Sequence, residues 1–253
     1  MILVSNDDGI TSRGIRALVE TMMELGEVVV VAPNSPQSGM GHAITVGNTL
    51  RLDPSTAFED EGIVAYECSG TPADCVKLAK HHVLKDRRPD LVVSGINHGS
   101  NSSVSVLYSG TMSAAIEAAL EGLPAIGFSL CDYSLTADFS HALEFVRKIA
   151  LQALTEGIPP DVALNVNIPA RSESPIKGIK ICRQAKAKWT EAFEQRKDPH
   201  GRDYYWMAGN FVNFDRGEDT DEWALSQNYI SIVPCTFDLT SHHTLPALNN
   251  WNL

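Results

Sequence analysis

The first 33 residues, MILVSNDDGITSRGIRALVETMMELGEVVVVAP (residues 1–33), decide the fold class. An apolar run over residues 2–4 ends at a polar N-D-D-G turn, and residues 27–33 form a continuously apolar run, which is typical of a strand covered on both faces. Between these runs, apolar side chains recur at helical spacing after a Thr-Ser cap signal, at Ile15, Leu18, Val19 and Met22. A strand, a helix and a strand in this order predict a parallel sheet with right-handed crossovers.

The same alternation continues to about residue 169. We expect further strands at residues 63–70, 90–95, 124–130 and 162–169. We expect further helices at residues 71–84, 111–122 and 140–154. Thr71 stands where an N-cap is expected, with Pro72 in the first turn, and residues 44–53 predict a hairpin excursion. The predicted fold class is therefore α/β, with a doubly wound and mainly parallel sheet.

The pattern changes after about residue 182. Residues 204–214 are aromatic and strand-like, residues 218–227 are acidic and start a short helix, and residues 229–237 predict a strand before a polar tail. This segment has too few apolar positions for a core of its own. We therefore expect a core at residues 1–182 and a C-terminal hairpin and tail at residues 183–253. An arm that packs on a partner subunit and an edge hairpin on the same chain both fit this pattern.

Composition limits the classes of partner and the cellular compartment. The chain has 253 residues, 43% apolar residues and a formal net charge of −11, which argue for a globular protein whose main partner is neither duplex nucleic acid nor an anionic membrane. Five cysteines without a C-x-x-C pair indicate reduced thiols. No segment has the pattern of a signal peptide or a membrane span, so we expect a cytoplasmic protein.

Polar residues follow the predicted strands, and in an open parallel sheet the carboxyl ends of the strands meet at one ligand-binding edge. Asp7 and Asp8 are adjacent carboxylates, which repel each other unless a cation or N–H groups compensate them. Ser38 and Asn97 follow later strands and offer a hydroxyl and a carbonyl oxygen. Oxygen donors of this kind favour hard cations, so we predict one divalent cation per subunit, Mg²⁺ or Mn²⁺, at these four residues.

The same edge offers a site for an anion. Ser109, Gly110 and Thr111 precede a predicted helix, whose first N–H groups and dipole attract phosphate. Further substrate-binding candidates in the strand-end loops are Asn6, Gly39 and Asn101. Each motif also has a purely structural interpretation, because S-G-T is a common helix cap and N-D-D-G can form an Asx turn. Their placement after successive strands of one sheet favours a joint site.

Five segments carry a resemblance to a known family: SNDDGITSRGIRAL (5–18), APNSPQSGMGHAIT (32–45), SGTPADCV (69–76), SGINHGSN (94–101) and YSGTMSAAIEA (108–118). In this order they resemble the SurE survival proteins, metal-dependent 5'-nucleotidases of the cytoplasm. Weaker similarity continues to about residue 235. Met112 and Ser113 depart from the smaller or β-branched residues expected after S-G-T, and His42 stands at a variable position; these departures bear on substrate preference.

The resemblance implies a Rossmann-like core with a projecting C-terminal β-hairpin and tail that exchange between subunits of a homodimer or homotetramer. It implies a metal held by Asp7, Asp8, Ser38 and Asn97. It also implies hydrolysis of nucleoside 5'-monophosphates with broad specificity, together with side activities on 3'-nucleotides and polyphosphate.

The mechanism that we expect places the substrate phosphate between the metal and Ser109–Thr111, with water as the nucleophile and Asp7 or Asp8 orienting or deprotonating it. Asp238 and His242 are a weaker candidate pair for a general acid or a supporting contact. An aspartyl-phosphate mechanism at Asp7 is an alternative, but the D-x-D pattern of the haloacid dehalogenases is absent. A phosphate-signalling receiver lacks its phosphorylatable Asp here. A metal- and nucleotide-binding sensor without turnover stays open.

Overall fold

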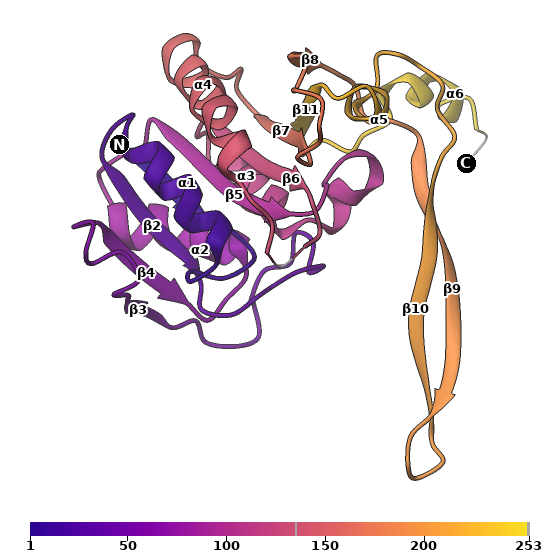
Figure 1. The fold of residues 1–253 in the computed structure, drawn as a ribbon, viewed down its shortest axis with the longest axis horizontal. Coiled ribbons are helices and arrows are strands. Elements are labelled where there is room, and N and C mark those ends of the chain that lie inside the picture. The colour runs from indigo at the N-terminus through magenta and orange to yellow at the C-terminus, as the bar shows by residue number, and fades with distance from the viewer. Residues whose placement is uncertain (135, 252–253) are drawn as a thin grey trace.

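The computed structural model describes residues 1–134 and 136–251. Its centre is a nine-stranded sheet with the strand order β3, β4, β2, β1, β5, β6, β7, β11, β8, and a separate hairpin of β9 and β10 (Figure 1). The strands are β1 (Ile2–Ser5), β2 (Val28–Pro33), β3 (Leu52–Pro54), β4 (Val64–Cys68), β5 (Leu91–His98), β6 (Ala125–Cys131), β7 (Val162–Pro169), β8 (Ile179–Ile181), β9 (Ala187–Lys197), β10 (Asp203–Asn213) and β11 (Ile230–Thr236).

Six neighbouring strands, β4, β2, β1, β5, β6 and β7, are mutually parallel. The chain first adds strands on one side of β1 and then, from β5 on, adds them on the other side. This is the order of a doubly wound sheet, and ligands bind where the direction of growth reverses, here between the carboxyl ends of β1 and β5. The predicted fold class is confirmed.

Helices cover both faces of the sheet (Figure 1). The α-helices are α1 (Arg13–Met23), α2 (Pro72–Leu78), α3 (Gly110–Leu120), α4 (Ser140–Glu156), α5 (Asp221–Ser226) and α6 (Leu245–Leu248). The shorter helical segments are the π-helix η1 (Ala79–Leu84) and the 3₁₀-helices η2 (Ser103–Tyr108) and η3 (His242–Thr244). Within the described residues, no helix combines the length and apolarity needed to cross a membrane.

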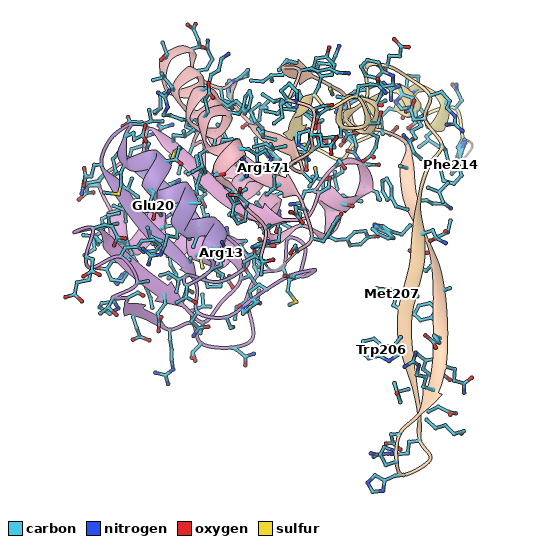
Figure 2. The ribbon with its side chains drawn as sticks, viewed as in Figure 1. Arg13, Glu20, Arg171, Trp206, Met207 and Phe214 are labelled. Carbon is cyan, nitrogen blue, oxygen red and sulfur yellow. The ribbon has the colours of Figure 1, made fainter. Side chains whose placement is uncertain are left out.

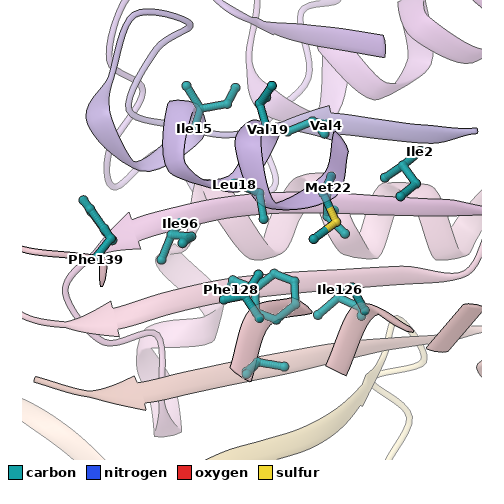
Figure 3. Packing of buried hydrophobic residues seen from close by; sticks show 14 of the residues in the cluster. Ile2, Val4, Ile15, Leu18, Val19, Met22, Ile96, Ile126, Phe128 and Phe139 are labelled. Carbon is teal, nitrogen blue, oxygen red and sulfur yellow. The ribbon is translucent and has the colours of Figure 1, made fainter. Parts of the chain in front are cut away.

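The apolar stripe predicted for the first helix is buried as expected. Ile15, Leu18, Val19 and Met22 of α1 are all fully shielded from solvent. They join side chains of β1, β5, β6 and α4 in one core cluster, and Figure 3 shows Leu18 and Met22 with Phe128 in this cluster. A second cluster lies between the other face of the sheet and α2 and α3. This two-sided burial accounts for the continuously apolar strands.

The predicted N-terminal caps of α1 and α2 differ in the structure. Thr71 caps α2 as predicted: its hydroxyl accepts the N–H of Asp74, and Asp74 accepts the N–H of Thr71 in return. Ser12 occupies the N-cap position of α1, but its hydroxyl accepts a hydrogen bond from Asn6 instead of capping the helix.

The predicted hairpin excursion at residues 44–53 is wrong in its extent. Only β3, at Leu52–Pro54, is a strand, and it pairs antiparallel with β4 rather than within the excursion. Residues 44–51 form no strand because their polar groups bond to neighbouring elements; Thr45, for example, donates both its N–H and its hydroxyl to Asp74.

The C-terminal region contributes both to the sheet and to a projection from it. β9 and β10 form an antiparallel hairpin that extends far from the rest of the molecule (Figure 1). The chain then returns, and β11 pairs with β7 and β8 in the main sheet. The expected division at residue 182 therefore separates strands of one sheet, and the part that projects is residues 187–213.

Candidate active site

The expected metal-binding residues follow neighbouring strands at the point where the sheet reverses its direction of growth. β1 and β5 pair in parallel with Ser5 opposite Ser94. Asp8 follows the end of β1, and Asn97 is near the end of β5, so both belong to the carboxyl ends of neighbouring parallel strands. This is the crevice in which an open α/β sheet binds its ligand.

Asp7 lies against the N-terminus of α3. Its side chain is buried, and the Thr111 hydroxyl donates to Asp7 Oδ1 at 2.6 Å. Gly110 permits this approach, because a Cβ at that position would lie 2.6 Å from the Asp7 Cβ and 2.8 Å from Oδ2. The predicted acidic turn and the predicted S-G-T turn therefore meet in space.

The two adjacent carboxylates are both destabilised in their ionised form by burial. Burial raises the pKa of Asp7 to about 6; the Thr111 hydrogen bond opposes this shift, and the charge of Asp8 adds to it. Burial also raises the pKa of Asp8, opposed by the ring and backbone of His98. In the described part of the chain, neither carboxylate forms an ion pair with a lysine or an arginine. Such a pair is suited to a bound cation.

The remaining donors at the crevice are neutral oxygens. The Asn97 amide nitrogen donates to the carbonyls of His98 and Gly99, so its oxygen is the atom available to a ligand. Among residues 1–134 and 136–251, no group of three or more His, Cys, Asp or Glu side chains could hold a metal. Two carboxylates with neutral oxygens are a donor set that fits Mg²⁺ or Mn²⁺ better than Zn²⁺.

Ser38 reaches this region on a loop tied to the acidic turn. The Gln37 N–H donates to the backbone carbonyl of Asp7 at 2.7 Å, which places the next residue, Ser38, beside the site. Ser38 and Gly39 are exposed, and Gly39 has a positive φ of +76°. Glycine adopts this left-handed backbone conformation without strain, which lets the loop turn directly after Ser38.

Asn6, a predicted substrate contact, uses its amide nitrogen to hold the acidic turn. Its amide nitrogen donates to the Gly9 carbonyl and to the Ser12 hydroxyl, so both donors serve the turn that presents Asp7 and Asp8. The Asn6 Oδ1 atom is buried without a hydrogen-bond partner in the described residues.

The predicted anion site lies at the N-terminus of α3, where Ser109 is the N-cap residue. The Ser109 hydroxyl accepts the Met112 N–H and so caps the helix. Thr111 is directed towards Asp7, which leaves the Ser109–Gly110 end of the helix and its dipole for an anion. Met112, one of the unexpected residues, is buried against β6, where a Cβ on Gly127 would lie 2.4 Å from its sulfur. The glycine makes the space that Met112 fills.

Asn101 lies in a buried polar network that sequence reasoning missed. Its N–H donates to Asn167 Oδ1, its carbonyl accepts from the Asn165 amide, and its own amide donates to Ser129. Asn165 and Asn167 alternate along β7, which is otherwise a buried strand. The sequence signal for this network was the pair of asparagines two residues apart in a buried strand, because buried amides need hydrogen-bond partners. The network holds the loop between β5 and η2.

Asp238 and His242 lie in the C-terminal tail that follows β11. His242 Nε2 is 2.8 Å from Asp238 Oδ2, and both side chains are exposed. A hydrogen bond from Thr240, followed by that from His242, lowers the pKa of Asp238 to about 2. Asp238 lines a cavity of about 860 Å³ along α3 that also touches Ser109.

Comparisons with known proteins identify the family. The sequence profile described as "Survival protein SurE" matches residues 2–191. The chain belongs to the SurE family. A protein of Cytophaga hutchinsonii named 5'-nucleotidase SurE is 72% identical over 249 residues, which cover 98% of this chain and 95% of that protein. A protein of Flavobacterium psychrophilum with the same name is 61% identical over 253 residues, covering 100% of this chain and 98% of the relative.

A solved SurE structure supports the fold over nearly the whole chain. The crystal structure of the SurE protein from Aquifex aeolicus has a TM-score of 0.84 and 39% sequence identity, and the match covers 98% of each chain. The likeness therefore extends beyond the residues matched by the SurE profile, through the hairpin and β11. The resemblance inferred from the sequence is confirmed, and so is the Rossmann-like fold.

Proposed function

We propose that this SurE chain is a 5'-nucleotidase that hydrolyses nucleoside 5'-monophosphates with the help of a divalent cation. The observation that carries the proposal is the contact between the buried Asp7 carboxylate and the N-terminus of α3, beside a second carboxylate without a cationic partner in the described residues. This contact supports a proposed cation site at the carboxylates and a proposed anion site at the helix N-terminus next to it. Relatives of high identity that are named 5'-nucleotidase SurE support the choice of substrate.

Four side chains would hold the cation. Asp7 and Asp8 supply negative charge, and Ser38 and Asn97 supply neutral oxygens. When bound, a divalent cation there neutralises charge on the phosphoryl group and activates water. The raised pKa of Asp7 supports this assignment, because a bound cation would stabilise the ionised carboxylate that burial disfavours.

The chain's own residues then position the phosphate. The Ser109–Gly110 end of α3 binds its oxygens through backbone N–H groups and the helix dipole. Thr111 keeps Asp7 in place through its hydroxyl. Asp8, which is less buried than Asp7, orients or deprotonates the attacking water. Gly39 lets the Ser38 loop approach the substrate, and Asn101 and Asn6 hold the loops that border the site.

Two alternatives lead to different observations. An aspartyl-phosphate on Asp7 requires an accessible nucleophile, whereas this side chain is 4% exposed. A sensor would bind nucleotide and cation without turnover. Broad specificity and side activities on 3'-nucleotides and polyphosphate belong to the same proposal, because the site contacts the phosphate through general features rather than base-specific ones.

We also propose a homodimer or homotetramer assembled through the C-terminal arm. The hairpin carries large exposed apolar side chains, including Trp206 at 58% and Met207 at 73% exposure. Figure 2 shows both on the projecting strand, far from the sheet. Contiguous exposed apolar surface of this kind marks a protein interface. A cytoplasmic location completes the proposal, supported by five free cysteines.

The test is phosphate release by metal-stripped protein from a panel of nucleoside 5'-monophosphates, with and without Mg²⁺ or Mn²⁺. Turnover that depends on the cation supports the proposal and ranks the substrates. Nucleotide binding without turnover by correctly folded protein would favour the sensor. An acid-stable phosphoenzyme trapped during turnover would favour the aspartyl-phosphate mechanism.

A further inference from the structure

A buried charged cluster lies beside the site and has no role in the reaction described above. The Glu117 side chain on α3 is 4% exposed, and each of its oxygens has a partner from a different element. His42 Nε2 lies 2.9 Å from Oε2, and Lys77 Nζ of α2 lies 2.6 Å from Oε1. Burial acts to raise the pKa of Glu117, but the hydrogen bonds from His42 and Lys77 outweigh it and lower the pKa. Glu117 is therefore an ionised anchor.

His42 belongs to the Ser38 loop, which we define as residues 37–45. The two ends of this loop are fixed independently of Glu117. At the first end, the Gln37 N–H donates to the Asp7 carbonyl, and at the other end the Thr45 hydroxyl donates to Asp74 at 2.7 Å. The backbone conformation of the stretch between these ends, which contains Ser38, is not set by these two hydrogen bonds.

The Ala43 carbonyl accepts the Thr71 hydroxyl at 2.7 Å and so belongs to the fixed end of the loop. Among the described residues, two contacts tie the remaining stretch, residues 38–42, to other elements. The Gly41 N–H donates to the Tyr108 carbonyl at 3.2 Å, which is a long hydrogen bond. The His42 contact with Glu117 is shorter and ends on a charged group, so it is the stronger of the two. In the part of the chain that the structure describes, His42 is the side chain of residues 38–42 that bonds to another element.

A second His–Glu pair, between η1 and the C-cap of α3, does not involve residues of the loop. Glu121 lies one turn after Glu117 on the C-terminal side of α3, and its partners are Lys80 and His81. His81 Nε2 lies 3.3 Å from Glu121 Oε1, with the histidine in η1. This pair joins the same two residue types as His42–Glu117, is more exposed, and links η1 to the C-cap of α3. It provides a matched control within the chain.

We propose that His42, held by the buried carboxylate of Glu117, is a positioning residue that sets the Ser38 loop in the conformation in which Ser38 completes the cation site. The inference rests on the proposed function, because it needs Ser38 to be a ligand. His42 acts through the loop and does not touch the reacting atoms. Its effect is therefore expected first in cation affinity, before any substrate is present.

The experiment is a titration of metal-stripped protein with Mn²⁺, followed by electron paramagnetic resonance of the free ion, without nucleotide. We expect His42→Ala to weaken Mn²⁺ binding roughly tenfold, as loss of a group that orients a ligand does. We expect His42→Gln to recover most of the affinity, because its amide supplies an N–H donor to Glu117. His81→Ala, the matched control, should bind Mn²⁺ like the wild type. Thermal unfolding of each metal-free variant checks that the fold is retained.

The outcomes separate this inference from the proposal on which it rests. Normal Mn²⁺ binding by His42→Ala, or equal weakening in His81→Ala, would overturn the positioning role alone. A wild-type protein that binds no Mn²⁺ would overturn both this inference and the proposed cation site. Weak binding in His42→Ala with recovery in His42→Gln supports the inference.

Discussion

Replacing Asp7 by asparagine should stabilise the metal-free protein while it removes activity. The folded protein raises the pKa of Asp7 from 3.8 to about 6, mainly through burial, so the ionised carboxylate disfavours folding. Since one pKa unit corresponds to about 1.36 kcal/mol, this shift corresponds to roughly 3 kcal/mol of lost stability above pH 6. Asparagine has nearly the same shape, carries no charge and still accepts the Thr111 hydroxyl.

The sign of the effect depends on pH. Well below the unfolded value of 3.8, Asp7 is protonated in both the folded and the unfolded wild type, so its pKa shift does not change stability there. Between the unfolded value of 3.8 and the folded value of about 6, only the unfolded state gives up the proton, and the wild type loses stability. The advantage of Asp7→Asn should therefore be small at pH 4, grow through this interval and level off above pH 7.

The assay is urea unfolding of both proteins with a chelator, at one protein concentration, from pH 4 to pH 8. The change of the stability difference with pH is the decisive quantity, because packing effects of the substitution do not depend on pH. A difference that stays constant with pH, or that moves against the variant as pH rises, would refute the reasoning. Added Mn²⁺ should stabilise the wild type by about 2.7 kcal/mol at a hundred times its Kd, and the variant by much less.

Three further predictions concern the neighbours of Asp7 and the arm. Thr111→Val removes a hydrogen bond to a buried carboxylate, worth about 1.5–3 kcal/mol, so the pKa of Asp7 should rise further and the acid limb of the pH–rate profile should move to higher pH. An unchanged profile would contradict this. Gly110→Ala places a Cβ 2.6 Å from that of Asp7, so activity should fall more than about tenfold, with about 1–3 kcal/mol of stability lost; normal kinetics would show that the contact is unimportant. Trp206→Ser combined with Met207→Ser should reduce the molar mass measured by light scattering while circular dichroism stays the same. An unchanged mass would exclude these side chains from the interface.

The sequence predicts the sheet and the site because both depend on local patterns. Apolar runs and the helical stripe of α1 are fixed by burial, and the placement of Asp7 and Thr111 at one edge follows from parallel strands. Their direct contact could not be derived from spacing, since it needs the close approach that Gly110 permits. Gly110 has no side chain, so it adds nothing to the apolar periodicity from which contacts are predicted.

The parts that sequence reasoning missed depend on long-range polar contacts. His42 and Glu117 are 75 positions apart, and Asn101 and Asn167 are 66 apart. Single-sequence patterns carry no information on such pairs. The pairing of β11 with β7 and β8 in the main sheet was missed for the same reason. The local pattern of residues 230–236 predicts a strand, but it does not distinguish a strand of the arm from a strand of the core.

The most direct test of the account compares the wild type with Asp8→Asn in Mn²⁺-dependent phosphate release from the preferred nucleoside 5'-monophosphate. Asp8 is only partly buried, so the variant should fold normally, and circular dichroism together with the unfolding midpoint checks this. We expect Asp8→Asn to lose turnover by several orders of magnitude with the fold intact. Turnover by Asp8→Asn at the wild-type rate would contradict a catalytic cation site at the end of β1.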